Sequence, residues 1–288
     1  MSTGGDYSRW FVTTDWLARH LNDPDVVVVD GTWHLPTTGR SGAREYEAAH
    51  IPGAVFFDID AIADTTNPLP HMLPTPEAFA KAAGALGIDE KQRIVVYDSV
   101  GISSAPRVWW TFRIMGAEDV VILEGGLPKW QMEKRFVETG AAKHPPARRF
   151  NTRFDPRAVT GLAQVQANLA AGNFQLVDAR PAPRFLGEAP EPRDWVKSGR
   201  VPDSFNVPSS DLIADGRMKG PHELRNIFSR AGVDLSKPIV TSCGSGVNAA
   251  TLSLALDVLG VEHTSLYDGS WTEWGSRNDM PIATGPRR

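Results

Sequence analysis

The 288-residue sequence contains a single cysteine, Cys243. One cysteine excludes an intramolecular disulfide, and it excludes metal sites built from several thiolates, such as iron–sulfur centres and cysteine-rich zinc sites. The seven histidines show no spacing typical of metal ligands, so we expect neither a metal nor any other cofactor. Any thiol chemistry of this chain must therefore centre on Cys243.

Long hydrophobic runs are also missing. The longest aliphatic run, Val26–Val29, is far shorter than the roughly 20 residues that a membrane-spanning helix needs. Residues 1–10 are polar and contain no apolar segment typical of a secretory signal. We therefore expect a cytoplasmic protein without a membrane partner.

Positive charge is not in excess. The chain has 30 Lys and Arg residues against 34 Asp and Glu residues, which gives a net charge of −4. This balance offers no broad electrostatic surface for nucleic acid, although a local basic pocket is compatible with it. The hydrophobic content of 41% and the charged content of 22% are ordinary for a globular protein and argue against a disordered chain.

The sequence repeats itself once. Four short motifs recur in the same order at separations of about 145 residues, which is the size of a domain rather than of a solenoid repeat. The paired motifs are Val27–Asp30 with Gln175–Asp178, His50–Gly53 with Arg200–Asp203, Ile94–Asp98 with Ile239–Cys243, and Glu124–Trp130 with Asp268–Trp274. A proline-rich stretch without clear periodicity, 140–156, separates the two copies. We predict domains at 1–142 and 159–288, joined by a linker at 143–158.

Short β-branched runs alternate with helical segments in both copies. The runs predict buried strands at Val26–Asp30, Arg93–Asp98, Val120–Leu123, Gln175–Asp178, Pro238–Ser242 and Thr264–Tyr267. Between the last two, Ala249–Leu259 places its apolar residues on one helical face, and Gly260 follows as a suitable C-terminal residue. The alternation predicts an α/β fold with two domains, each a mostly parallel sheet flanked by helices.

Cys243 lies at the end of a predicted strand, and Gly244–Asn248 connects it to the predicted helix. Ligands of open α/β sheets bind beyond the carboxyl ends of the strands. A glycine-containing turn that leads into a helix can aim several backbone N–H groups at one point, which favours an anion such as a thiolate. The first copy has Asp98 at this position, so the fold itself does not require a cysteine there. A buried structural cysteine is the alternative interpretation.

These features together resemble the tandem rhodanese-domain sulfurtransferases. The residues that carry the resemblance are His50–Ala54, Cys243–Val247 and Tyr267–Trp271. The Cys243–Val247 loop is similar to that of 3-mercaptopyruvate sulfurtransferases, whereas thiosulfate-preferring rhodaneses usually have basic residues after the cysteine. The resemblance extends from Trp10 to Trp274 and implies an inactive N-terminal and a catalytic C-terminal domain. Cysteine-dependent phosphatases would need an arginine where this chain has Ala249, which argues against that activity.

The resemblance implies a substrate site around the cysteine loop. Arg184 and Arg193 match the two arginines that bind the carboxylate and keto group of 3-mercaptopyruvate, and a planar guanidinium suits a carboxylate. The alternative for both is a surface arginine in an ion pair, which is the interpretation that we keep for Arg180. The loop residues expected to contact substrate are Gly244, Gly246, Val247 and Asn248. Asn248 stands where the family commonly has threonine.

The resemblance also implies a group that moves a proton. Ser245 would reach the reacting sulfur, and His71 together with Asp60 matches the pair proposed to assist such a serine. Both His71 and Asp60 fall in the predicted first domain, so we expect an active site between the domains. A structural role for His71 is the alternative.

The sequence therefore predicts a sulfurtransferase that moves sulfur from 3-mercaptopyruvate through a Cys243 persulfide and releases pyruvate. The acceptor would be a thiol, including that of a thioredoxin-like protein, or cyanide. One alternative is the same chemistry with thiosulfate as the donor. Another is a non-catalytic sulfur carrier or redox interaction module that uses Cys243 stoichiometrically.

Overall fold

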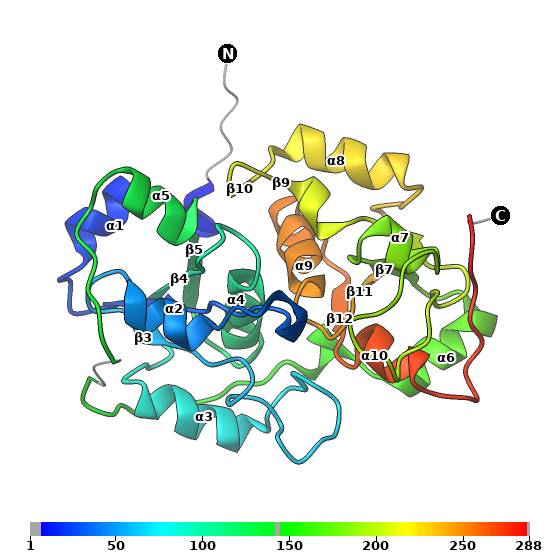
Figure 1. Ribbon diagram of the computed structural model, residues 1–288, viewed down its shortest axis with the longest axis horizontal. Helices are drawn as coiled ribbons and strands as arrows, with labels where there is room; N and C mark the ends of the chain where they lie inside the picture. Colours follow the sequence, from blue (N-terminus) through cyan, green and yellow to red (C-terminus); the bar gives the residue numbers. More distant parts are fainter. Residues whose placement is uncertain (1–6, 142–144, 287–288) are drawn as a thin grey trace. The chain divides into compact units, whose positions relative to one another are not determined.

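The computed structural model describes residues 7–141 and 145–286 (Figure 1). These residues form two compact units. The first unit takes 7–64, most of 74–155 and 215–217, and the second takes 65–73, 156–214 and 218–286. The main division thus falls between Asp155 and Pro156, within the predicted linker. Residues 143 and 144 of that linker lie outside the described residues.

The described linker residues up to Asp155 belong to the first unit. Phe150 is buried against the rings of Phe79 and Phe112, at centroid distances of 5.2 and 6.1 Å. The backbone N–H groups of Arg153 and Asp155 donate to Met115 and Ile114. One aromatic side chain thus fixes a stretch whose proline content predicts only a connector.

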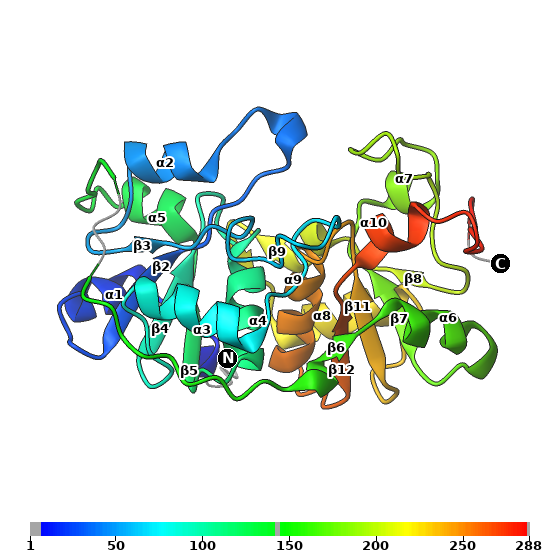
Figure 2. The ribbon, with the colours of Figure 1, turned by 90° about the horizontal axis from the view of Figure 1, so that it is seen from below.

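The first unit contains a parallel five-stranded sheet in the order β1-β5-β4-β2-β3. Its strands are β1 (Phe11–Val12), β2 (Val26–Asp30), β3 (Val55–Phe56), β4 (Arg93–Tyr97) and β5 (Asp119–Leu123). Its helices are α1 (Thr14–His20), α2 (Gly42–Ala48), α3 (Pro76–Ala85), α4 (Ala105–Ile114) and α5 (Gly126–Met132). Helices lie on both sides of the strands, so each strand is apolar on both faces and reads as a continuous hydrophobic run (Figure 2).

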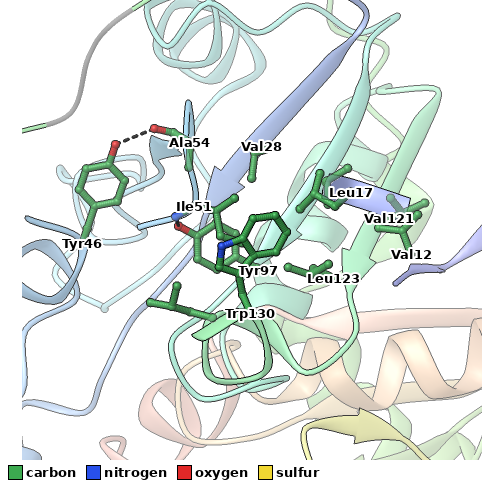
Figure 3. Close-up of a cluster of buried hydrophobic side chains, with 12 residues drawn as sticks. Val12, Leu17, Val28, Tyr46, Ile51, Ala54, Tyr97, Val121, Leu123 and Trp130 are labelled. Carbon is green, nitrogen blue, oxygen red and sulfur yellow. Dashed lines mark hydrogen bonds between the residues drawn. The ribbon is translucent and has the colours of Figure 1, made fainter. Parts of the chain in front are cut away.

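One core cluster of the first unit shows how the helices cover the sheet (Figure 3). Leu17 of α1 and Trp130 of α5 pack with residues of β2, β4 and β5. Figure 3 shows the Trp130 indole beside Tyr97, whose hydroxyl accepts the Ile51 N–H at 3.2 Å. Tyr97 is the last residue of β4, so this packing fixes the carboxyl end of the strand.

The second unit repeats this architecture. Its parallel sheet has the order β6-β12-β11-β7-β8. The strands are β6 (Val159–Thr160), β7 (Gln175–Asp178), β8 (Phe205–Asn206), β11 (Ile239–Ser242) and β12 (Thr264–Tyr267), and β9 (Ile213–Ala214) and β10 (Arg217–Met218) form a separate pair. The helices are α6 (Leu162–Ala171), α7 (Ala182–Phe185), α8 (Pro221–Arg230), α9 (Ala249–Val258) and α10 (Ser270–Gly275). The predicted fold class is confirmed.

The predicted strands differ from the observed ones only at their ends. β4 stops at Tyr97 rather than Asp98, because the Asp98 carboxylate turns back onto the N–H groups of the following loop. The central strands of the two sheets, β4 and β11, are followed by Asp98 and Cys243. The sheet of the second unit therefore presents Cys243 at the carboxyl end of its middle strand.

Across the described parts of the chain, no helix combines the length and the apolar character needed to cross a bilayer. The same residues contain no group of three or more His, Cys, Asp or Glu side chains able to hold a metal ion.

Candidate functional site

Cys243 is buried, with 3% of its surface exposed. Its backbone N–H donates to the Ser270 Oγ at 3.1 Å, and the Ser270 hydroxyl donates in turn to the Tyr267 carbonyl at 2.8 Å. The Cys243 carbonyl accepts the Trp271 N–H at 3.0 Å. The start of α10 therefore holds the Cys243 backbone on both sides, which fixes the direction of its side chain.

The loop after Cys243 leads directly into α9. Gly246 takes a left-handed backbone conformation, with φ of 79°, which glycine adopts at little cost. The Gly244 carbonyl accepts both the N–H and the hydroxyl of Thr272, at 2.8 and 2.6 Å. Within the residues that the structure describes, the N–H groups of Ser245, Val247 and Asn248 donate to no protein acceptor. The loop thus carries backbone donors suited to an anion beside the sulfur.

The matching loop of the first unit shows where such donors converge. The Asp98 carboxylate is fully buried and accepts five backbone N–H groups at 2.7–3.0 Å. The donors are Val100, Gly101, Ser103, Ser104 and Ala105, the last being the first residue of α4. A loop that joins the central strand to its helix in this fold can therefore bind an anion through its backbone alone.

His71 belongs to the second unit by its contacts, although its position in the chain led us to expect it in the first domain. Its Nδ1 lies 2.9 Å from the Ser245 Oγ and 3.2 Å from the Ser245 carbonyl oxygen, and both residues are buried. The segment Thr65–Leu73 brings the imidazole to the cysteine loop. The serine hydroxyl two residues after Cys243 therefore lies within hydrogen-bond distance of a histidine.

Asp60 lies in the first unit and is exposed. Its carboxylate accepts the indole N–H of Trp33 at 3.0 Å, and its own N–H donates to Asp58 at 3.0 Å. The pairing of Asp60 with His71 stays a prediction.

Arg184 extends from α7 toward the cysteine loop. Its Nη2 lies 3.3 Å from the position that a Cβ on Gly244 would occupy, so the glycine allows the guanidinium to approach the loop backbone. Its Nε and Nη2 also donate to the Glu191 carboxylate, the former at 3.2 Å. The guanidinium is thereby held in place while 17% of the side chain stays exposed. Arg193 lies two residues beyond Glu191 and is half-buried.

Arg180 forms ion pairs, as the sequence-based interpretation predicts, but it is buried rather than at the surface. Its guanidinium is buried between Asp178 and Glu191, with closest distances of 2.7 and 2.8 Å, and it stacks on Trp271. Burial lowers the pKa of Arg180, but the two carboxylates outweigh this effect and raise it above the usual value. Glu191 therefore links a structural arginine to Arg184 and fixes the orientation of both.

Three residues of this site have no role in the sequence-based prediction: Glu191, Asp268 and Ser270. Glu191 stands in an arginine-rich stretch that also contains Glu188 and Asp194, so the sequence carries no signal that singles it out. Asp268 and Ser270 lie in the Tyr267–Trp271 motif, which carries the family resemblance without any indication of what each side chain contacts. Their partners are fixed by the tertiary structure.

Comparisons with known proteins agree with this architecture. The rhodanese-like domain model matches twice, at residues 13–133 and 162–277. The chain is 46% identical to 3-mercaptopyruvate sulfurtransferase of Escherichia coli over 96% of this chain and 98% of the relative. It is 42% identical to thiosulfate/3-mercaptopyruvate sulfurtransferase 1 of Arabidopsis thaliana, over 94% of this chain and 77% of that one.

A solved structure gives the same result. The crystal structure of SseA from Escherichia coli, a 3-mercaptopyruvate sulfotransferase with the rhodanese fold, matches with a TM-score of 0.84 at 45% identity. The match covers 91% of this chain and 98% of that chain. With two matching domains and full-length relatives of this similarity, the chain belongs to the rhodanese-like family.

Proposed function

We propose that the chain is a 3-mercaptopyruvate sulfurtransferase in which Cys243 carries the transferred sulfur. The observation that carries the proposal is the position of Arg184 beside Gly244, one residue after Cys243. A donor whose carboxylate binds this guanidinium can present its sulfur to the cysteine. The names of the relatives from Escherichia coli and Arabidopsis thaliana support the same donor.

The first half-reaction transfers the donor sulfur to the enzyme. The Cys243 thiolate attacks the thiol sulfur of 3-mercaptopyruvate, a sulfur–sulfur bond forms, and the sulfur–carbon bond breaks. The bonding electron pair leaves on carbon as the enolate of pyruvate, which needs one proton. The thiol hydrogen of the donor supplies this proton, so the products are pyruvate and a Cys243 persulfide anion.

Ser245 and His71 provide a route for this proton. A Ser245 hydroxyl that donates to His71 Nδ1 is a better proton carrier than an isolated serine. The imidazole can accept the serine proton and return it within one turnover. Arg184 and Arg193 orient the carboxylate and keto group. Backbone N–H groups of the loop, among them those of Gly244, Val247 and Asn248, stabilise the persulfide, as the N–H groups of the first loop stabilise the Asp98 carboxylate.

The second half-reaction passes the outer sulfur to an acceptor. A thiol attacks the outer sulfur, leaves as a persulfide and restores the Cys243 thiolate, whereas cyanide would leave as thiocyanate. A thioredoxin-like protein is the protein acceptor that we propose. The reaction suits the cytoplasm, where Cys243 and the acceptor thiols are kept reduced.

Thiosulfate is the second candidate donor, and the Arabidopsis thaliana relative is named for both substrates. A sulfonate also fits an arginine pocket. The loop from Gly244 to Asn248 contains no basic residue, however, and this favours the carboxylate donor. A stoichiometric sulfur carrier needs no small-molecule pocket, so the placement of Arg184 and Ser245 argues against that role.

Initial rates with 3-mercaptopyruvate and with thiosulfate, measured with cyanide as the shared acceptor, test the proposal. We expect kcat/KM to favour 3-mercaptopyruvate and to fall about 10–100-fold in Arg184→Ala, because a charge-assisted contact to the carboxylate is lost. Arg225→Ala, at an exposed arginine of α8, is the matched control and should leave kcat/KM unchanged. Dominance of thiosulfate would overturn the donor, and turnover of neither donor would support the carrier.

A further inference from the structure

The segment that carries His71 has little internal structure to hold it. Residues 65–73 contain no helix or strand. Pro70 and Pro74 flank the three residues His71–Leu73. His71 itself takes a left-handed backbone conformation, with φ of 62°, which is unfavourable for a residue other than glycine. The position of the imidazole must therefore be imposed by contacts with the rest of the second unit.

A buried carboxylate provides one of these contacts. Asp268 follows β12 and is 4% exposed, and its Oδ2 accepts the Leu73 N–H at 2.7 Å. Leu73 lies two residues after His71. Because the Asp268 carboxylate is buried, water competes little for this hydrogen bond. The contact ties the exit of the His71 turn to the sheet edge that carries Cys243.

We propose that Asp268 is a positioning residue for the proton relay: by holding the Leu73 N–H it keeps His71 Nδ1 against the Ser245 hydroxyl. Asp268 does not touch the reacting atoms in this account and acts only through His71. The inference rests on the proposed sulfurtransferase function for its catalytic meaning, but the contact itself can be tested without turnover.

The kinetic test is a double-mutant cycle between Asp268→Ala and His71→Ala. With 3-mercaptopyruvate as donor, Asp268→Ala should lower kcat about tenfold and change KM less than about twofold. In the His71→Ala background the same substitution should have no further effect. Asp268→Asn keeps an oxygen acceptor in place and should restore most of kcat. Equal losses in both backgrounds would show that Asp268 acts independently of His71 and would overturn the proposal.

Glu90→Gln is the matched control. Glu90 is a buried carboxylate of the first unit that accepts the Asn151 N–H at 2.9 Å, so it also anchors a connecting segment through a backbone donor. We expect this variant to lower thermal stability while leaving kcat unchanged. A similar drop in kcat in Glu90→Gln would mean that loss of any such anchor lowers activity, and it would count against a specific role of Asp268.

Hydrogen exchange separates this inference from the proposed function. The Leu73 amide should exchange slowly in the wild-type protein and at least about tenfold faster in Asp268→Ala, while the amides of β11 keep their protection. The His71 ring nitrogen signals should shift in the same variant. If wild type failed to turn over any donor, the proposed function would fall, and these two readouts would still decide the role of Asp268. Unchanged Leu73 exchange and unchanged His71 signals would contradict it.

Discussion

The loops after the central strands β4 and β11 differ in the side chain that stands at their first position. In the first unit, Asp98 places a carboxylate at the point where five backbone N–H groups converge. In the second unit, Cys243 takes the corresponding position, and among the described residues no protein acceptor faces the N–H groups of Ser245, Val247 and Asn248. The first loop therefore holds an anion supplied by its own side chain, and we propose that the second loop keeps its backbone donors for the sulfur of Cys243.

A second contrast concerns the acids at the ends of β2 and β7. Asp178 is paired with the buried Arg180. Asp30 has no such arginine at the corresponding position, which is Thr32, and its carboxylate accepts the Thr32 N–H at 2.9 Å. Burial is the main reason that the pKa of Asp30 is raised to about 6. The second unit thus pairs this acid with an arginine, whereas the first unit holds it with hydrogen bonds alone.

The largest expected effect comes from making the second loop like the first. Cys243→Asp should reduce sulfur transfer at least about 1000-fold, because the nucleophile is lost and a carboxylate takes the anion site. The fold should persist, since the first unit tolerates an aspartate at the equivalent position. Steady-state rates and circular dichroism check this expectation, with Cys243→Ser as the isosteric control. Near-normal turnover in either variant would remove Cys243 from the mechanism.

The converse change breaks the first loop. Asp98→Ala leaves five backbone N–H groups, three of them in buried hydrogen bonds, without their acceptor, and we expect a loss of unfolding free energy of about 3–5 kcal/mol. Asp98→Asn keeps an oxygen acceptor and should lose less. Urea denaturation measures the difference. A stability equal to wild type in Asp98→Ala would mean that the carboxylate does not organise this loop.

The Asp30 contrast predicts a stability that depends on pH. Because the folded-state pKa is raised above the usual 3.8, the folded state disfavours the charged form, and its stability falls as pH rises from about 4 through 6. A shift of this size corresponds to about 3 kcal/mol once Asp30 is fully ionised. Asp30→Asn should therefore be more stable than wild type at pH 7.5 and lose that advantage at pH 4. Denaturation midpoints at both pH values test the sign, and a constant difference would refute it.

The smallest expected effect concerns the approach of Arg184 to the cysteine loop. A Cβ at position 244 would lie 3.3 Å from Nη2, so Gly244→Ala should displace the guanidinium slightly. We expect KM for 3-mercaptopyruvate to rise about threefold with little change in kcat. Gly260→Ala, at a glycine with open space around it, controls for the added methyl group but introduces strain at φ of 73°. A change in kcat alone would indicate that the glycine serves the nucleophile rather than the arginine.

Much of the fold follows from the sequence because it depends on local periodicity. The buried strands, such as β2 and β7, are continuous β-branched runs, and the repeat confirms each assignment independently. Cys243 could be identified as the candidate nucleophile because its setting between strand and helix is also local. The described linker residues were harder to assign, since a single buried Phe150 outweighs the composition around it.

The rest of the site depends on contacts between residues far apart in the chain. His71 and Ser245 are 174 residues apart, and the segment that carries His71 shows no periodicity that would assign it to a unit. The contact of Leu73 with Asp268 spans 195 residues. Glu191 pairs with two arginines at once, which composition alone cannot reveal. Such pairings arise from the tertiary packing of irregular segments, and only the structure identifies them.

The most direct test of the central claim is the mass of the protein after one equivalent of 3-mercaptopyruvate is added without acceptor. We expect the peptide containing Cys243 to gain the mass of one sulfur atom, with one pyruvate released per sulfur gained, and a later addition of cyanide to remove this mass. Pyruvate release without any gain of mass on Cys243, or a gain of sulfur at another residue, would contradict the account.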